Sequence, residues 1–128
     1  MKYYINKTIA ANFDKATELV REALKQEGFG ILSEIDIQQT LKEKLSVDFR
    51  RYKILGACNP PYAYKALQQE DKIGTMLPCN VIIQETGENQ VEVAAVDPSI
   101  SMMVVDNKEL AGIAGEIKGK LEQVIKSL

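Results

Sequence analysis

The chain has 128 residues, of which 45% are hydrophobic and 27% are charged, and its formal net charge is −2. These values are typical of a globular protein with a proper core, and we expect a single domain over residues 1–128. So small a net charge does not favour a nucleic-acid or membrane surface, and we expect neither partner. The sequence holds no histidine, which excludes Ser-His-Asp and Cys-His nucleophiles and HExxH zinc sites within the chain.

Cysteine usage and the first residues bear on the cellular compartment. Two cysteines in a chain of this length do not make a disulfide scaffold. The first twenty residues lack the apolar core and cleavage site of a signal peptide, and no apolar run approaches the length of a membrane span. We therefore expect a reduced, cytoplasmic protein.

We predict that strands and helices alternate in the first half of the chain. Residues 2–9 are rich in tyrosine and isoleucine and predict a strand. The next apolar residues fall on one helical face and predict a helix over residues 12–27, which Gly28 ends. Residues 28–35 predict a second strand, and Asp36 with Gln39 predicts a capped short helix. Residues 52–57 predict the third strand.

A sharp corner follows at Cys58-Asn59-Pro60-Pro61. A residue before proline is pushed toward extended geometry, so we expect Asn59 to cap a short helix that begins at Pro60. Cys58 would end the third strand beside that helix start, where a thiolate is favoured. The two prolines lack N–H groups, which makes this helix start a poor phosphate site.

The second half predicts a loop, a hairpin and a long helix. Residues 71–78 read as a loop, and residues 80–85 and 91–96 predict the hairpin. Its antiparallel strands should pair residues 81–83 with residues 91–93. Asp97-Pro98 stops the second strand, and residues 99–105 are either an extended segment or an apolar loop. A continuous apolar stripe predicts the last helix over residues 108–127.

Three glycines form a second stripe on the last helix. Gly112, Gly115 and Gly119 lie almost opposite the apolar stripe, at about 100° per residue. Each glycine costs roughly 1 kcal/mol relative to alanine in a helix interior, so the stripe implies a weak helix or a close approach. We expect a homodimer, with the glycine face as one possible contact. The alternative is that another part of the same chain covers this face.

The mixture of early helices and a late hairpin favours an α+β fold, with one mainly antiparallel sheet and helices packed on one side. The stretches GFGILSEIDIQQTLKEKL, YKILGACNPPYAYKAL, LPCNVIIQE and VAAVDP resemble the family called domain of unknown function 302. The resemblance covers nearly the whole chain. It implies a dimeric bacterial or archaeal protein with a β-α-β-β-β-β-α core similar to the TATA-binding-protein fold, with two short extra helices. Many relatives carry histidine where this chain has Tyr64.

The two cysteines are the candidate catalytic residues. Cys58 and Cys79 each border a predicted strand and precede an asparagine, so we expect them to lie close together, reduced, at one end of the sheet. The alternative is that both are small buried hydrophobic residues. We expect no metal site, because two thiols without histidine leave a tetrahedral zinc ion short of ligands, although two subunits together would supply four cysteines.

Four polar residues are candidate ligand-binding groups: Asn59, Tyr62, Asn80 and Asp97. We expect Asn59, Asn80 and Asp97 to converge at one end of the sheet, and Tyr62 to line a cleft. The alternative is local, since asparagine and aspartate often form caps and turns, and tyrosine often buries a ring face. No cofactor is indicated. Two functions remain open: a binding module for a small ligand or protein partner, and a thiol enzyme or redox sensor that uses Cys58 with Cys79.

Overall fold

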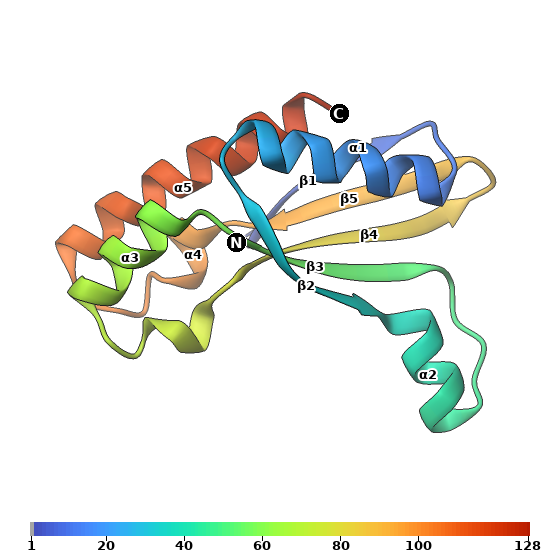
Figure 1. Cartoon of the computed structure of the whole chain (residues 1–128), viewed down its shortest axis with the longest axis horizontal. Coiled ribbons are helices and arrows are strands. Elements are labelled where there is room, and N and C mark those ends of the chain that lie inside the picture. Colours follow the sequence, from blue (N-terminus) through green and yellow to red (C-terminus); the bar gives the residue numbers. More distant parts are fainter. Residues whose placement is uncertain (1) are drawn as a thin grey trace.

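The structure is a computed structural model that describes residues 2–128 and shows a five-stranded antiparallel sheet with helices packed on one side (Figure 1). The strands lie in the order β1-β5-β4-β3-β2. The elements along the chain are β1 (Tyr4–Ile9), α1 (Phe13–Gln26), β2 (Gly30–Asp36), α2 (Ile37–Leu45), β3 (Tyr52–Cys58), α3 (Pro60–Gln69), the 3-10 helix η1 (Ile73–Met76), β4 (Cys79–Gly87), β5 (Gln90–Val96), α4 (Pro98–Ser101) and α5 (Lys108–Lys126). The predicted α+β class and the β-α-β-β-β-β-α order of the core are confirmed.

Local hydrogen bonds and backbone geometry explain where the long helix α1 begins and ends. Asn12 caps α1 by accepting a hydrogen bond from the Lys15 amide, at 2.8 Å. Gly28 follows α1 with a φ of +84°, a left-handed conformation that glycine adopts without strain. The Phe29 amide then bonds to the Leu24 carbonyl, which completes the helix end. The two predicted long helices are both confirmed, as α1 and α5.

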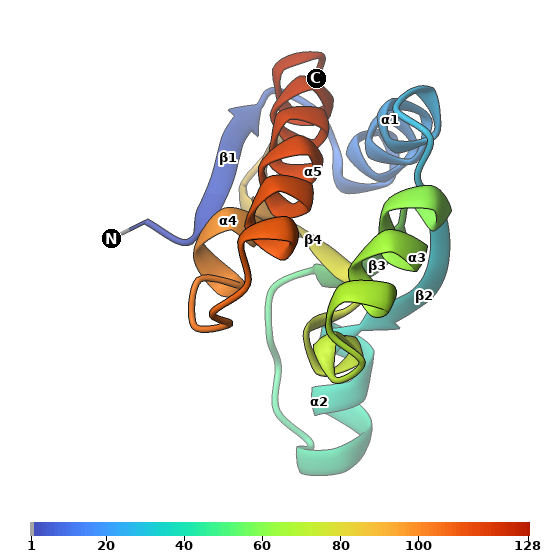
Figure 2. The same cartoon turned by 90° about the vertical axis from the view of Figure 1, so that its left-hand side faces the viewer.

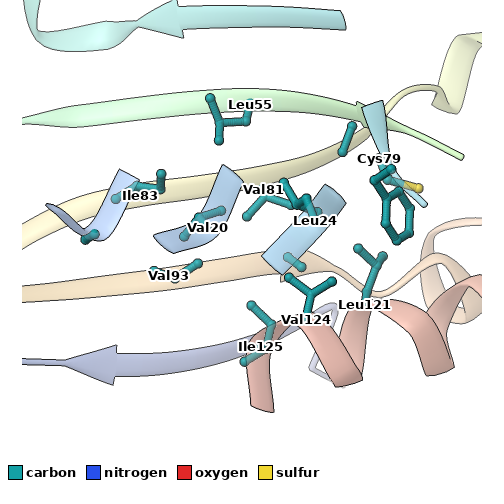
Figure 3. Close-up of a cluster of buried hydrophobic side chains, with 14 of the residues drawn as sticks. Val20, Leu24, Leu55, Cys79, Val81, Ile83, Val93, Leu121, Val124 and Ile125 are labelled. Atoms are coloured by element: carbon teal, nitrogen blue, oxygen red, sulfur yellow. The ribbon is translucent and has the colours of Figure 1, made fainter. Parts of the chain in front are cut away.

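The main core lies between these helices and one face of the sheet (Figure 3). Leu24 of α1 and Leu121 of α5 are fully buried against the strands. Burial of each such side chain stabilises the fold by about 1.5–3 kcal/mol. The other large buried side chains alternate along the strands, as a sheet with one covered face requires. They include Leu55, Val81, Ile83, Val91 and Val93.

The glycine stripe on α5 faces open space. Among the described residues, no heavy atom would lie within 4 Å of a Cβ added at Gly112, Gly115 or Gly119. The expectation that another part of the same chain covers this face is therefore wrong. Contact with a second copy through this face stays a prediction.

The segment after β5 differs from its prediction. Residues 98–101 form α4 instead of an extended segment or loop, because Asp97 accepts a hydrogen bond from the Ser99 amide and Pro98 takes the first helical position. The predicted hairpin is present, but its predicted register is wrong by two residues: residues 81–83 pair with residues 93–95, with Ile83 opposite Val93 and Val81 opposite Ala95. Asn89, with a φ of 50°, shapes the hairpin turn. Within the predicted loop over residues 71–78, the structure places η1.

The second face of the sheet carries no long helix. Figures 1 and 2 show α1 and α5 on one side and α2 on the other, standing beyond the ends of β2 and β3. No residue of α2 is buried. Asp36 caps α2 as predicted, at 2.9 Å from the Gln39 amide, but the Gln39 side chain bonds to Glu43 instead of reaching back to Asp36.

Candidate functional site

Two thiols lie at one end of the sheet. Cys58 is the last residue of β3 and Cys79 is the first residue of β4. The antiparallel register places Ala57 directly opposite Cys79, so the two cysteines are one residue out of direct opposition on adjacent strands. Both are free thiols.

The two thiols differ in their surroundings. Cys79 is 5% exposed and belongs to the main core, whereas Cys58 is half-buried. Burial, with a smaller contribution from the neighbouring Cys58, raises the pKa of Cys79 to about 11. Cys79 is therefore a protonated thiol at neutral pH, which makes it a poor nucleophile. Its burial also argues against a zinc site shared between two subunits.

Asn59 joins the corner to the end of α1. It occupies the N-cap position of α3, but its side chain makes no capping hydrogen bond, so that part of the prediction is wrong. The reason is that Pro60 and Pro61 have no N–H groups, and the next two amides bond to the Asn59 carbonyl. The Asn59 amide group instead donates to the carbonyl of Glu27, at 3.1 Å. The asparagine thereby fixes the corner to the C-terminal end of α1.

A pocket of about 310 Å³ opens beside this corner, between the sheet end, α3, η1 and α5. Its volume lies at the lower end of the range for small-molecule sites. Cys58, Asn59 and Cys79 line it, and nearly all of the remaining wall is apolar. These other lining residues include Phe29, Leu32, Ala63, Ala66, Leu67, Gly74, Leu77 and Ile117.

A β-bulge shapes the mouth of this pocket. Ile31 pairs with Ala57 and Ser33 pairs with Gly56, which leaves Leu32 as the extra residue of β2. Leu32 is 70% exposed, although it is a large apolar side chain. The bulge directs Leu32 to the pocket instead of to the core. A partner molecule in the pocket would cover this side chain.

Asp97 lies at the start of α4 and is occupied by local bonds. Its carboxylate accepts hydrogen bonds from the Ser99 amide, at 3.0 Å, and the Ser99 hydroxyl, at 2.6 Å, and it forms an ion pair with Lys118, at 3.3 Å. Burial opposes ionisation, but the bonds from Ser99 and Lys118 outweigh it and hold the pKa of Asp97 below its ordinary value. Asp97 therefore holds α4 against α5.

The predicted convergence of Asn59, Asn80 and Asp97 is not what the structure shows. Asn80 is exposed and lines a shallow depression of about 380 Å³ on the opposite face of the sheet. Tyr62 packs against the main core, with the Lys120 ammonium 5.8 Å from its ring centre. Only Asn59, of the four predicted polar residues, lines the same pocket as the cysteines.

The apolar walls of the pocket were missed at the level of sequence. Ala63, Leu67 and Gly74 carry no chemical signature, and η1 falls within the segment that the sequence predicts to be a loop. The available signal was the glycine pair around Phe29, since a bulge in a strand often begins near glycine. The corner motif indicates where the pocket lies, whereas the apolar residues determine which ligands it suits.

The fold and the pocket define a small α+β protein with a binding-sized apolar pocket at one end of an antiparallel sheet. The chain belongs to the family described as domain of unknown function DUF302, whose profile matches residues 5–128. A crystal structure of an uncharacterized conserved protein DUF302 from Bacillus stearothermophilus is similar, with a TM-score of 0.91 and 25% sequence identity. The match covers 99% of this chain and 98% of that chain. No curated protein matches the chain.

Two further observations concern residues 2–128. In this part of the chain, none of the helices combines the length and the apolar character that crossing a bilayer requires. Over the same residues, histidine, cysteine, aspartate and glutamate do not gather in groups of three or more suited to a metal ion.

Proposed function

We propose that the protein is a cytoplasmic, homodimeric binding module that holds a small, largely apolar molecule in the pocket beside Cys58. The observation that carries this proposal is the pocket of about 310 Å³, whose wall is almost wholly apolar. An apolar ligand would gain about 25 cal/mol for each Å² of apolar surface removed from water. The exposed Leu32 at the pocket mouth supports the same ligand class.

The polar groups of the pocket would orient such a ligand. Asn59 is only 8% exposed and its amide nitrogen is held by the Glu27 carbonyl, so its side chain cannot rotate freely. Cys58 contributes a half-buried thiol to the wall. Few polar groups among many apolar ones are typical of small-molecule sites, in which the polar groups determine orientation.

The proposal is tested by filling the pocket. Gly74 lines the pocket and a Cβ added there would meet no heavy atom within 4 Å, so Gly74→Leu is the variant designed to add volume to the pocket wall. Gly112→Leu is the matched control, because its Cβ position is equally open and lies outside this pocket. The probe is 1-aminoanthracene, a neutral apolar fluorophore.

Bound probe raises the free energy of unfolding of a protein whose native state it binds. We expect a concentration-dependent rise in the melting temperature of the wild type and of Gly112→Leu, and at least a tenfold weaker effect in Gly74→Leu. Equal effects in all three proteins, or no effect in the wild type, would refute the proposal.

A second candidate function is thiol redox chemistry between Cys58 and Cys79. The neighbouring strand positions of the two residues favour it. Two thiols would lose two electrons and two protons to a peroxide, which is reduced to water, as a disulfide forms between the sulfur atoms. Cys79 would serve as the resolving thiol, and because it is buried with a raised pKa, this step requires the strand end to open locally. A rise of disulfide content on peroxide titration of the wild type, absent in Cys58→Ser, would support this function.

The compartment and the assembly belong to the same proposal. Free cysteines on adjacent strands fit a reducing compartment, where thiols stay unpaired. The uncovered glycine face of α5 and the uncovered face of the sheet both leave room for a second copy. Sedimentation at micromolar concentration tests the assembly, and a clean monomer would reject it.

A further inference from the structure

We infer that a second copy of this chain binds the uncovered face of the sheet. In this two-fold symmetric dimer, α2 of each copy packs on the sheet of the other copy. The inference rests on the homodimer part of the proposed function and names the surface that forms it. We call this surface the sheet floor. Its central row, in register across four strands, is Ile35, Ile54, Ile82 and Ala94.

The sheet floor has an apolar centre and a polar border. Ile35 is an exposed large apolar side chain, and Ile54 and Ile82 are half-buried although no long helix covers them. One row along the strands, Gln84 and Glu92 face each other across β4 and β5. An apolar centre surrounded by polar groups is the usual anatomy of a protein interface.

The polar border is already hydrogen-bonded within the chain. The Glu92 carboxylate accepts from the Asn6 amide and from the Gln84 amide, each at 2.8 Å. The Gln84 oxygen in turn accepts from the Arg50 guanidinium, at 2.8 Å. A partner that covers these groups therefore meets several hydrogen bonds already made within the chain, which lowers the cost of burying polar groups. A carboxylate in this position disfavours nucleic acid, whose phosphates it would repel.

The helix α2 is the second part of the surface. Its apolar residues Ile37, Leu41 and Leu45 are spaced four apart and fall on one helical face. None of them is buried, and Leu45 is 65% exposed. A helix of nine residues is marginal in water without tertiary packing. A partly exposed apolar stripe on so short a helix therefore favours a packing partner.

The geometry favours a second copy as that partner. Figures 1 and 2 show that α2 stands on the same side as the uncovered sheet face, so that the two form a floor and a wall. Four strand spacings and six residues per strand give a floor of about 400 Å². A stable dimer buries about 800 Å² on each partner, so the floor alone supplies roughly half. The helix α2 adds to the buried area only if the partner has an apolar sheet face against which α2 can pack. An identical chain has such a face.

The experiment is sedimentation equilibrium at micromolar concentration with four variants. Leu45→Lys changes the tip of α2, and Ile82→Lys changes the centre of the sheet floor. Val104→Lys is the control for an added lysine, because Val104 is 80% exposed and lies outside the surface. Gly115→Leu tests the glycine face, where its Cβ meets open space.

We expect the wild type, Val104→Lys and Gly115→Leu to be dimers. The dimer dissociation constant of Leu45→Lys and of Ile82→Lys should be at least 100-fold higher than that of the wild type. Should Ile82→Lys fail to fold, Leu45→Lys decides, because its side chain is exposed in the single chain. A wild-type monomer, dimeric Leu45→Lys, or dissociation by Gly115→Leu alone would overturn the inference. A wild-type monomer that binds a DNA duplex would assign the floor to nucleic acid instead. Melting shifts with 1-aminoanthracene on the same variants report the pocket separately, since Leu45 and Ile82 do not line it.

Discussion

The difference in reactivity between the two thiols provides a quantitative test of the site. The variant Cys58→Ser leaves Cys79 as the single thiol, and Cys79→Ala leaves Cys58. Burial, with a smaller contribution from Cys58, raises the pKa of Cys79 to about 11, which leaves only ~10⁻³ of this thiol ionised at pH 8. The larger cause, burial, stays in Cys58→Ser. An ordinary cysteine with a pKa near 8.5 is roughly one-quarter ionised at that pH.

The charge effect alone therefore slows Cys79 by a factor of about 250 relative to an ordinary cysteine, since the thiolate is the nucleophile. Access slows it further, because a side chain that is 5% exposed reacts only when the structure opens. Cys58 is half-buried and lines the pocket, so it does not need such an opening.

The assay follows the colour released from 5,5′-dithiobis(2-nitrobenzoate) at pH 8, with each variant folded and in guanidinium chloride. We expect folded Cys58→Ser to react more than about 250-fold more slowly than the same variant unfolded. Folded Cys79→Ala should react at least tenfold faster than folded Cys58→Ser. A folded Cys58→Ser variant that reacts within a few-fold of its unfolded form would refute our description of Cys79.

Three further predictions concern stability. Gly115→Ala should raise the free energy of unfolding by about 1 kcal/mol, because alanine suits a helix interior and its Cβ meets no atom; calorimetry should show a higher melting temperature. Gly56→Ala should lower it by about 1–3 kcal/mol in a denaturant titration, because the added Cβ would overlap the Ser33 Oγ and lie 2.7 Å from the Cγ of the Pro78 ring; an unchanged midpoint would contradict this close packing. Asp97→Asn should cost about 1–3 kcal/mol at pH 7. Folding lowers the pKa of Asp97, so the ionised carboxylate stabilises the fold above its unfolded pKa near 3.9, and this stabilisation is lost as the pH falls through the folded pKa. The difference in free energy of unfolding between Asp97→Asn and the wild type should therefore shrink below about pH 4. Urea titrations across pH would measure it.

The parts of the fold that rest on periodicity were predictable. The stripes of α1 and α5 match their buried faces, and Gly28 ends α1 through its left-handed backbone, as the sequence indicated. Local rules failed where a tertiary bond competed with them. Asn59 has the sequence context of a helix cap, yet its side chain bonds to a carbonyl 32 residues away because two prolines left it few amides to cap.

The candidate site was predictable in position but not in chemistry. The strand ends at Cys58 and Cys79 follow from the corner motif and from the start of the hairpin. Which polar residues share a cavity depends on strand register, and one step along a strand turns a side chain to the other face. That step separates the exposed Asn80 from the buried Cys79. The apolar walls come from distant segments and have no local signal.

The most direct test of the proposed pocket is a titration of isotope-labelled protein with 1-aminoanthracene, followed by amide chemical shifts. Our description predicts saturable shifts at Leu32, Ala63 and Gly74, which surround the pocket from three different segments. It predicts unchanged shifts at Ile82, on the opposite face of the sheet. Shifts that never saturate, or that cluster around Ile82 and leave Ala63 unchanged, would contradict the pocket as the binding site.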